Sequence, residues 1–134
     1  MRGTLVDSNV ILDVLTKDPV WFSWSTVNLE VCASEGLLYI NPIVYAEVSV
    51  NFATIEEVEE ALPAEAFQRL DLPSEAAFLA GKAFLRYRQS GGTRSKTLPD
   101  FFIGAHAAIT GLRLLTRDSK RYQTYFPTVE IVSP

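Results

Sequence analysis

The chain has 134 residues, of which 48% are hydrophobic and 21% are charged, with a mean hydropathy of +0.12 and a formal net charge of −4. This size and composition indicate one folded domain over residues 1–134, soluble and without a membrane span, because no apolar run is long enough to cross a bilayer and the start lacks a signal peptide's apolar region. The single cysteine, Cys32, excludes an internal disulfide and fits a reducing cytoplasm. Because His106 is also the only histidine, a zinc site or a catalytic cysteine–histidine pair within one chain is disfavoured.

The chain begins with a short strand followed by a helix. Residues 4–6 predict a strand, and Asp7 is the first residue that can leave it. Ser8 or Asn9 is then expected to cap a helix, which ends at the proline-containing break of residues 18–19. The first carboxylate of the chain therefore lies where a strand passes into a helix.

A second helix and a second strand follow. The pattern predicts a helix over residues 20–35, ended by a glycine, and a strand over residues 37–40. Asn41 and Pro42 are a cap residue and a first helical residue, so they open the next helix. Glu47 falls in its second turn among apolar neighbours, where a lone acid needs a functional reason.

The middle of the chain supplies the third strand and two helices. A capping box opens an acidic helix over residues 54–62, and residues 67–70 alternate enough for a strand. A longer helix is predicted over residues 74–89. The polar segment after it carries Arg94 and Lys96, which we expect to contact a phosphate backbone.

The stretch from residue 98 to residue 118 reads as helix, turn and strand. Asp100 stands where a carboxylate can cap a helix start, and residues 101–110 carry almost no polar side chain, so this helix should be buried. Gly111 can adopt the positive φ that ends it. The apolar residues 112–115 predict a covered parallel strand, and Asp118 follows that strand.

The end of the chain completes an α/β pattern. Residues 122–127 are interpreted as an aromatic connection, and residues 129–132 as the last strand. Strands that alternate with helices imply a mainly parallel sheet with right-handed crossovers and helices on both faces. In such a sheet, ligands bind at the carboxyl ends of the strands. Four acidic residues are expected at that edge: Asp7, Glu47, Asp100 and Asp118.

These carboxylates predict a metal site. Two unit charges about 4 Å apart repel by about 4 kcal/mol at an effective dielectric constant near 20, so the cluster must be protonated or must bind a cation. Oxygen ligands without histidine or cysteine favour Mg²⁺ or Mn²⁺, which activates water and offsets charge on a phosphodiester. Asp7, Asp100 and Asp118 are the expected metal ligands, and Glu47 completes the set or positions the attacking water. Supporting polar contacts are expected from Ser8, Asn9 and Thr116.

The order and spacing of four segments, at residues 5–9, 44–48, 98–107 and 115–118, resemble the PIN-domain pattern of VapC-type toxins over essentially the whole chain. The resemblance implies a Rossmann-like three-layer sandwich with a five-stranded sheet of order 3-2-1-4-5. It also implies a Mg²⁺- or Mn²⁺-dependent endoribonuclease that uses a metal-activated water. Such a toxin would form a homodimer, be neutralised by a cognate antitoxin, and reach operator DNA only through that antitoxin.

Carried over by residue, the resemblance assigns the family's acidic tetrad to Asp7, Glu47, Asp100 and Asp118, with Thr116 as the polar residue beside it. The family often has another acid near the last tetrad position, whereas residues 119–121 are serine, lysine and arginine here. The number of metal ions is therefore left open. Arg94, Lys96 and Arg117 are the residues expected to contact RNA.

Two other classes of protein remain open at this point. A metal-dependent phosphatase or receiver-like domain has a similar sheet and acidic pocket, but residues 7–9 lack the second acid of the Asp-x-Asp phosphatase pattern. The other alternative is an inactive PIN-type module that only binds protein. His106 is expected to be buried in the core or at an interface, not in the site.

Overall fold

A computed structural model describes residues 2–94 and 98–134 and contains a five-stranded sheet in which every pairing is parallel. The strand order is β3-β2-β1-β4-β5, as the resemblance implied. The strands are β1 (Thr4–Val6), β2 (Leu38–Ile40), β3 (Phe67–Arg69), β4 (Arg113–Leu115) and β5 (Ile131–Val132). The central strands β1 and β4 are buried throughout, as expected for a sheet covered on both faces.

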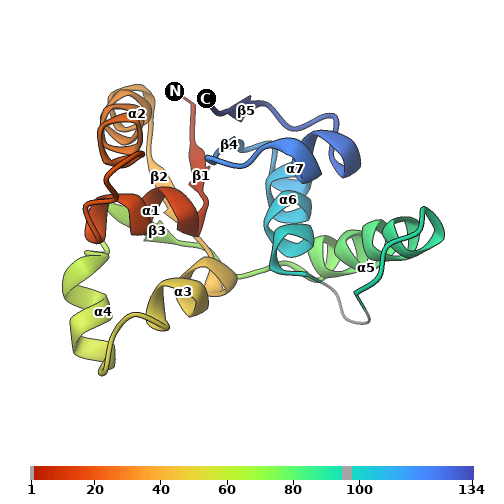
Figure 1. Cartoon of the computed structure of the whole chain (residues 1–134), viewed down its shortest axis with the longest axis horizontal. Helices are drawn as coiled ribbons and strands as arrows, with labels where there is room; N and C mark the ends of the chain where they lie inside the picture. The colour runs from red at the N-terminus through yellow and green to blue at the C-terminus, as the bar shows by residue number, and fades with distance from the viewer. Residues whose placement is uncertain (1, 95–97) are drawn as a thin grey trace.

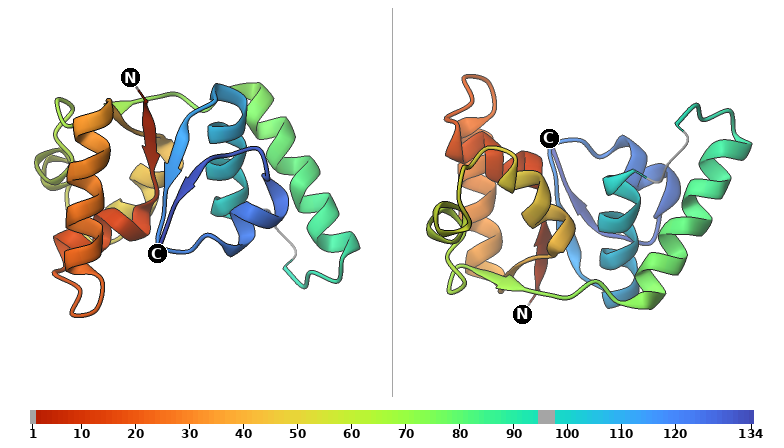
Figure 2. Two further views of the ribbon diagram at one scale, coloured as in Figure 1. Left: turned by 90° about the horizontal axis from the view of Figure 1, so that it is seen from above. Right: turned by 90° about the horizontal axis from the view of Figure 1, so that it is seen from below.

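Helices cover both faces of this sheet, and Figures 1 and 2 show α1 to α4 on one side of it and α5 to α7 on the other. They are α1 (Ser8–Leu15), α2 (Phe22–Glu35), α3 (Pro42–Ser49), α4 (Ile55–Ala61), α5 (Ser74–Gln89), α6 (Pro99–Thr110) and α7 (Lys120–Tyr125). This arrangement confirms the predicted α/β sandwich. No helix in the described residues is long and apolar enough to span a membrane.

Local sequence signals account for several helix ends. The side chain of Asn41 accepts a hydrogen bond from the Val44 N–H at 2.9 Å, and Pro42 follows as the first residue of α3. Thr54 and Glu57 form the predicted capping box at α4. Gly111 ends α6 with φ +70°, a backbone conformation that glycine adopts without strain.

Two predicted caps were placed one or two residues away from their true positions. The N-cap of α1 is Asp7, not Ser8 or Asn9, and its Oδ1 accepts a hydrogen bond from the Ser8 N–H at 2.8 Å. The N-cap of α6 is Leu98, so Asp100 is the second residue of that helix. In both cases the helix begins immediately at the end of the preceding extended segment, which leaves the carboxylate at the helix start but changes its hydrogen-bonding role.

The interpretation of residues 122–127 as a connection was wrong, because most of this segment belongs to α7. Tyr122 and Phe126 are spaced four residues apart, are both buried, and pack against Gly104 of α6. A side chain at residue 104 would collide with the Phe126 ring, so the glycine is what lets the two helices approach. The final strand is also shorter than predicted, with two residues in place of four.

Candidate active site

The carboxyl edge of the sheet brings together the four predicted acidic residues from four separate segments. Asp7 follows β1, Glu47 projects from α3, Asp100 from the first turn of α6, and Asp118 follows β4. Their charges interact: Asp100 and Glu47 both raise the pKa of Asp7, and Asp118 raises that of Asp100. The four carboxylates therefore lie at the same edge of the fold, and their role as a catalytic metal site stays a prediction.

Asp7 is the most deeply buried member, with 4% of its surface exposed. Its Oδ2 accepts hydrogen bonds from the hydroxyls of Thr116 and Tyr122, each at 2.8 Å. Burial is the main cause that raises the pKa of Asp7 from 3.8 to about 6, whereas these two hydrogen bonds act in the opposite direction. Near neutral pH this site therefore holds a carboxylate whose charge is poorly solvated.

Asp100 is held by two residues of α7. Arg121 donates to its Oδ2 at 3.2 Å, and the Tyr122 hydroxyl lies 3.3 Å from its Oδ1. The single hydroxyl proton of Tyr122 is shared between two carboxylates, and the shorter contact is the one to Asp7. Burial raises the pKa of Asp100, and the Arg121 charge partly counteracts this increase. Arg121 thus supplies positive charge at a site dominated by carboxylates.

Glu47 is positioned by a residue of α1. The Ser8 hydroxyl donates to Glu47 Oε1 at 2.9 Å, which places Ser8 in the supporting role predicted for it. Burial raises the pKa of Glu47, and the charge of Asp100 adds to this effect. The carboxyl group of Glu47 is consequently more basic than an exposed glutamate.

Thr116 and Asn9 join the ends of β1 and β4. The Thr116 hydroxyl donates to Asp7 and accepts from the Asn9 amide at 3.3 Å and from the Asp118 N–H at 3.2 Å. Asn9 Oδ1 in turn accepts from the Arg117 N–H at 3.1 Å. This network sets the orientation of the loop that carries Asp118.

The three residues expected to contact RNA have different environments. Arg94 is exposed, and its carbonyl oxygen accepts a hydrogen bond from Arg88; Lys96 lies outside the described residues. The guanidinium of Arg117 makes two hydrogen bonds of 3.0 Å to the buried carboxylate of Asp13, and its contact with RNA stays a prediction. The same carboxylate accepts a hydrogen bond from the Ser25 hydroxyl. Through Asp13, Arg117 therefore connects the loop after β4 to α1 and α2.

Sequence reasoning missed Tyr122, Arg121 and Asp13. Tyr122 and Arg121 lie on the helix that was interpreted as a connection, and a helical reading of that segment would have placed them near Asp118. Asp13 falls in the middle of α1, and nothing in its neighbourhood indicated an arginine partner 104 residues away. His106 is buried as expected, with its Nδ1 3.0 Å from the Asn41 side-chain nitrogen.

The donor set fits a hard divalent cation. Asp7, Glu47 and Asp100 all have raised pKa values, which means that their negative charges are under-solvated in the protein alone. Carboxylate oxygens are the ligands that Mg²⁺ and Mn²⁺ prefer. In residues 2–94 and 98–134, no three acidic, histidine or cysteine side chains are already arranged as an ion site.

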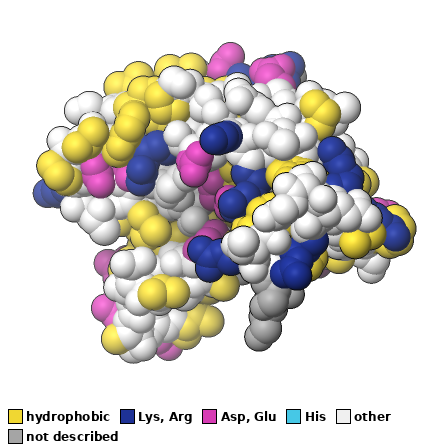
Figure 3. Space-filling model, turned by 45° about the vertical axis from the view of Figure 1, so that its right-hand side comes forward, with side chains coloured by type: hydrophobic (Ala, Val, Ile, Leu, Met, Phe, Trp, Pro, Cys, Tyr) yellow, Lys and Arg dark blue, Asp and Glu magenta, His cyan; other side chains and the backbone are white. Residues whose placement is uncertain are grey.

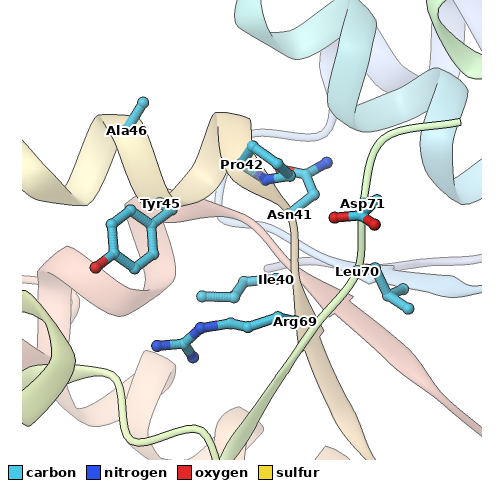
Figure 4. Close-up of a pocket in the computed structure, with 8 residues that line it drawn as sticks. All are labelled: Ile40, Asn41, Pro42, Tyr45, Ala46, Arg69, Leu70 and Asp71. Carbon is cyan, nitrogen blue, oxygen red and sulfur yellow. The ribbon is translucent and has the colours of Figure 1, made fainter. Parts of the chain in front are cut away.

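Two pockets open near the edge of the sheet. One, of about 360 Å³, adjoins the acidic cluster and is lined by Tyr87, Asp100, Asp118, Lys120, Arg121, Thr124 and Tyr125. The other, of about 300 Å³, lies at the ends of β2 and β3 and is mainly apolar (Figure 4). Part of its polar lining is bonded elsewhere, since Arg69 pairs with Glu59 and the Asn41 amide contacts His106. Only the first pocket contains members of the acidic cluster.

Comparison with known proteins shows similarity in sequence to one family and in structure to several complexes. The model of the PIN domain family matches residues 4–127. No curated protein sequence matches the chain.

Several similar solved structures are VapBC or other toxin–antitoxin complexes. VapBC2 from Rickettsia felis, bound to a DNA fragment from its promoter, is 20% identical with a TM-score of 0.75, and 98% of each chain is covered. VapBC-1 from nontypeable Haemophilus influenzae is 18% identical with a TM-score of 0.73, covering 98% of this chain and 97% of that one. A toxin–antitoxin complex from Klebsiella pneumoniae is 22% identical with a TM-score of 0.70, covering 96% and 95%. At these identities the likeness shows a shared fold.

Proposed function

The chain belongs to the PIN domain family, and from that premise we propose that it is the toxin of a toxin–antitoxin pair, a Mg²⁺- or Mn²⁺-dependent endoribonuclease. The observation that carries the proposal is the cluster of buried and half-buried carboxylates with raised pKa values at the carboxyl edge of the sheet. Such a cluster costs stability in the protein alone, and a divalent cation bound to a phosphodiester would offset that cost.

In the proposed reaction, Asp7, Asp100 and Asp118 would hold the cation, which when bound would supply a water of lowered pKa and offset charge on the phosphodiester oxygens. Glu47 accepts the proton of the attacking water, because its raised pKa makes it a better base near neutral pH than an exposed glutamate. The water oxygen bonds to phosphorus as the bond to the leaving oxygen of the RNA chain breaks, and the leaving oxygen takes up a proton from bulk water.

Other residues hold these groups in place. Ser8 keeps one oxygen of Glu47 in a hydrogen bond, so the base has a defined orientation. Thr116 and Tyr122 do the same for Asp7. Since Tyr122 also contacts Asp100, it fixes the separation between two proposed ligands.

The proposed partners follow from the similar structures. Three of these are toxin–antitoxin complexes, and one of the three includes promoter DNA. We therefore expect a cognate antitoxin to bind this chain and to provide the contact with operator DNA. A homodimer and a cytoplasmic location complete the proposal.

Cleavage of a mixed cellular RNA pool by the purified, antitoxin-free protein tests the function. Discrete fragments are expected with Mg²⁺ or Mn²⁺, and none with a chelator or with Asp100→Asn. Asp71→Asn is the matched control, because Asp71 is an exposed acid outside the cluster, and this variant should cleave like the unaltered protein. If a folded, metal-binding protein gave no fragments, the inactive binding module would replace the nuclease as the preferred reading.

A further inference from the structure

The pocket beside the acidic cluster has a lining of mixed charge. Its walls come from α5, the start of α6, and α7 with the loop before it. Asp100 and Asp118 form its acidic side, and Lys120 and Arg121 its basic side. Figure 3 shows the corresponding pattern, with lysine and arginine side chains gathered around acidic ones on one face of the molecule. A ligand that enters this pocket would touch the proposed metal ligands and cationic groups together.

Two arginines lie against tyrosine rings of this pocket: Arg121, which lines it, and Arg86, which does not. The guanidinium of Arg121 lies 5.7 Å from the centre of the Tyr87 ring, and that of Arg86 lies 5.6 Å from the centre of the Tyr125 ring. Both tyrosines line the pocket. A guanidinium stacked in this way loses less conformational freedom when it binds an anion, because its plane is already oriented.

Two of the three cations at this pocket, Arg86 and Lys120, have no carboxylate partner among the described residues, as is also true of Lys17 and Lys82 elsewhere. Four other arginines each pair with a carboxylate: Arg2, Arg69, Arg113 and Arg117. Arg121, the third cation at the pocket, pairs with Asp100. A protein with a net charge of −4 thus keeps unpaired cations next to its acidic cluster. Positive charge in that position favours a ligand that carries several negative charges.

We propose that this pocket binds a backbone phosphate of the RNA next to the bond that is cut, with Arg86, Lys120 and Arg121 as its cationic contacts. The inference rests on the proposed function, because it takes the acidic cluster as the place of cleavage. Neighbouring phosphates of one RNA strand are a single nucleotide apart, so a phosphate adjacent to the cleaved one must lie close to Asp100 and Asp118. The pocket places Lys120 and Arg121 in one cavity with Asp100 and Asp118 of the cluster.

This assignment changes which residues contact the substrate. Arg117 was expected to bind RNA, but its guanidinium is bound to Asp13. The phosphate contacts move instead to α7, whose Lys120 and Arg121 line the pocket, and to Arg86 of α5, which lies against the lining Tyr125. An acidic peptide would also be attracted to these cations. A polynucleotide fits better, because its adjacent phosphodiester is the group that the acidic cluster is proposed to cleave.

Binding measurements without metal test the proposal. Anisotropy of a labelled single-stranded RNA oligonucleotide is titrated in chelator at several salt concentrations, so that no cleavage occurs. The double variant Arg86→Gln/Lys120→Gln is compared with Lys17→Gln/Lys82→Gln, which removes the same charge from exposed lysines that neither line the pocket nor lie against its tyrosines. The slope of log affinity against log salt should become shallower by roughly 1.4 for the first variant, since each lost phosphate contact on a single strand is worth about 0.7. Affinity at 0.1 M salt should fall roughly tenfold or more, and the control variant should match the unaltered protein.

Three results would overturn the proposal. The first is an equal slope for both double variants, and the second is absence of RNA binding by the unaltered protein. The third is that Arg86→Gln/Lys120→Gln weakens binding of a hexaglutamate peptide but leaves the salt slope of RNA binding unchanged, which would assign the pocket to acidic peptides. Cleavage by the unaltered protein with Mn²⁺ is measured separately. If the unaltered protein cleaves RNA but the two double variants have equal salt slopes, the phosphate pocket is ruled out and the nuclease remains. If the slopes differ as expected but the unaltered protein does not cleave RNA, the proposed nuclease is ruled out and the phosphate pocket remains.

Discussion

Asp7 combines deep burial with negative charge, and its two hydroxyl donors do not compensate for the lost hydration. Its pKa of about 6 lies above the 3.8 of an unfolded aspartate, so the folded protein holds this proton more tightly. The stability linked to this proton is therefore fully present below about pH 3.8 and is lost as the pH rises through about 6. The full difference is about 3 kcal/mol, because each pKa unit corresponds to 1.36 kcal/mol.

Asp7→Asn removes this titration and should change how stability depends on pH. Between pH 4.5 and pH 7.5, without metal, the variant's unfolding free energy should rise by about 2 kcal/mol relative to that of the unaltered protein. The amide also alters the hydrogen bonds of this side chain, which changes the unfolding free energy by the same amount at both pH values. This constant change cancels when the two pH values are compared. Urea denaturation at both pH values measures the change, with Asp71→Asn as an exposed control that should show no such trend. A gap that stayed constant with pH would show that Asp7 does not titrate in this range.

The sequence was sufficient to find the four acids but not the groups that hold them. Asp7 and Asp118 follow strands, and parallel strands end at one edge, so their meeting could be deduced from local pattern alone. Tyr122 could not be found in this way, because its contact with Asp7 spans 115 residues and depends on the direction in which a short helix presents its hydroxyl. Asp13 illustrates the same limit, since its arginine partner becomes visible only when the helices pack.

At the scale of elements, strong local signals led to correct predictions. Asn41 before proline, the capping box at Thr54 and Gly111 after α6 each determine a helix end within a few residues. The helix α7 was missed because it has six residues and Ser119 provides no side-chain cap. It is stabilised by packing on α6, which no local pattern contains.

Gly104 tests how closely α6 and α7 must pack. A Cβ at this position would lie 3.0 Å from Cδ1 of Tyr122 and closer still to the Phe126 ring, so Gly104→Ala should push α7 away and lower the unfolding free energy by about 1–3 kcal/mol. Gly81→Ala on α5 is the matched control, because its Cβ meets nothing within 4 Å. That variant should gain about 0.5–1 kcal/mol from helix propensity. Thermal denaturation of both proteins decides the matter, and equal effects would contradict the close α6–α7 contact.

At the scale of the whole molecule, the acidic site is assembled only in the folded chain. Its carboxylates come from the residue after β1, from α3, from α6 and from the loop after β4, and residues of α1 and α7 orient them. In the unfolded chain these groups are far apart, so their affinity for one cation should be low. Metal binding and folding should therefore be linked, with the cation stabilising the native state by mass action.

This linkage predicts that Mg²⁺ or Mn²⁺ raises the melting temperature of the protein. At a concentration 100 times the Kd, the native state gains about 2.7 kcal/mol, which for a chain of this length corresponds to a shift of roughly 10 °C. Asp100→Asn should reduce the shift, because it removes a proposed ligand, whereas Asp71→Asn should retain it. Potassium chloride at matched ionic strength separates site binding from general screening, since screening acts on all exposed charges alike. If the salt control produced the same shift, or Asp100→Asn left it unchanged, the carboxylates would be structural charges without a bound cation, and the proposed nuclease would lose its chemical basis.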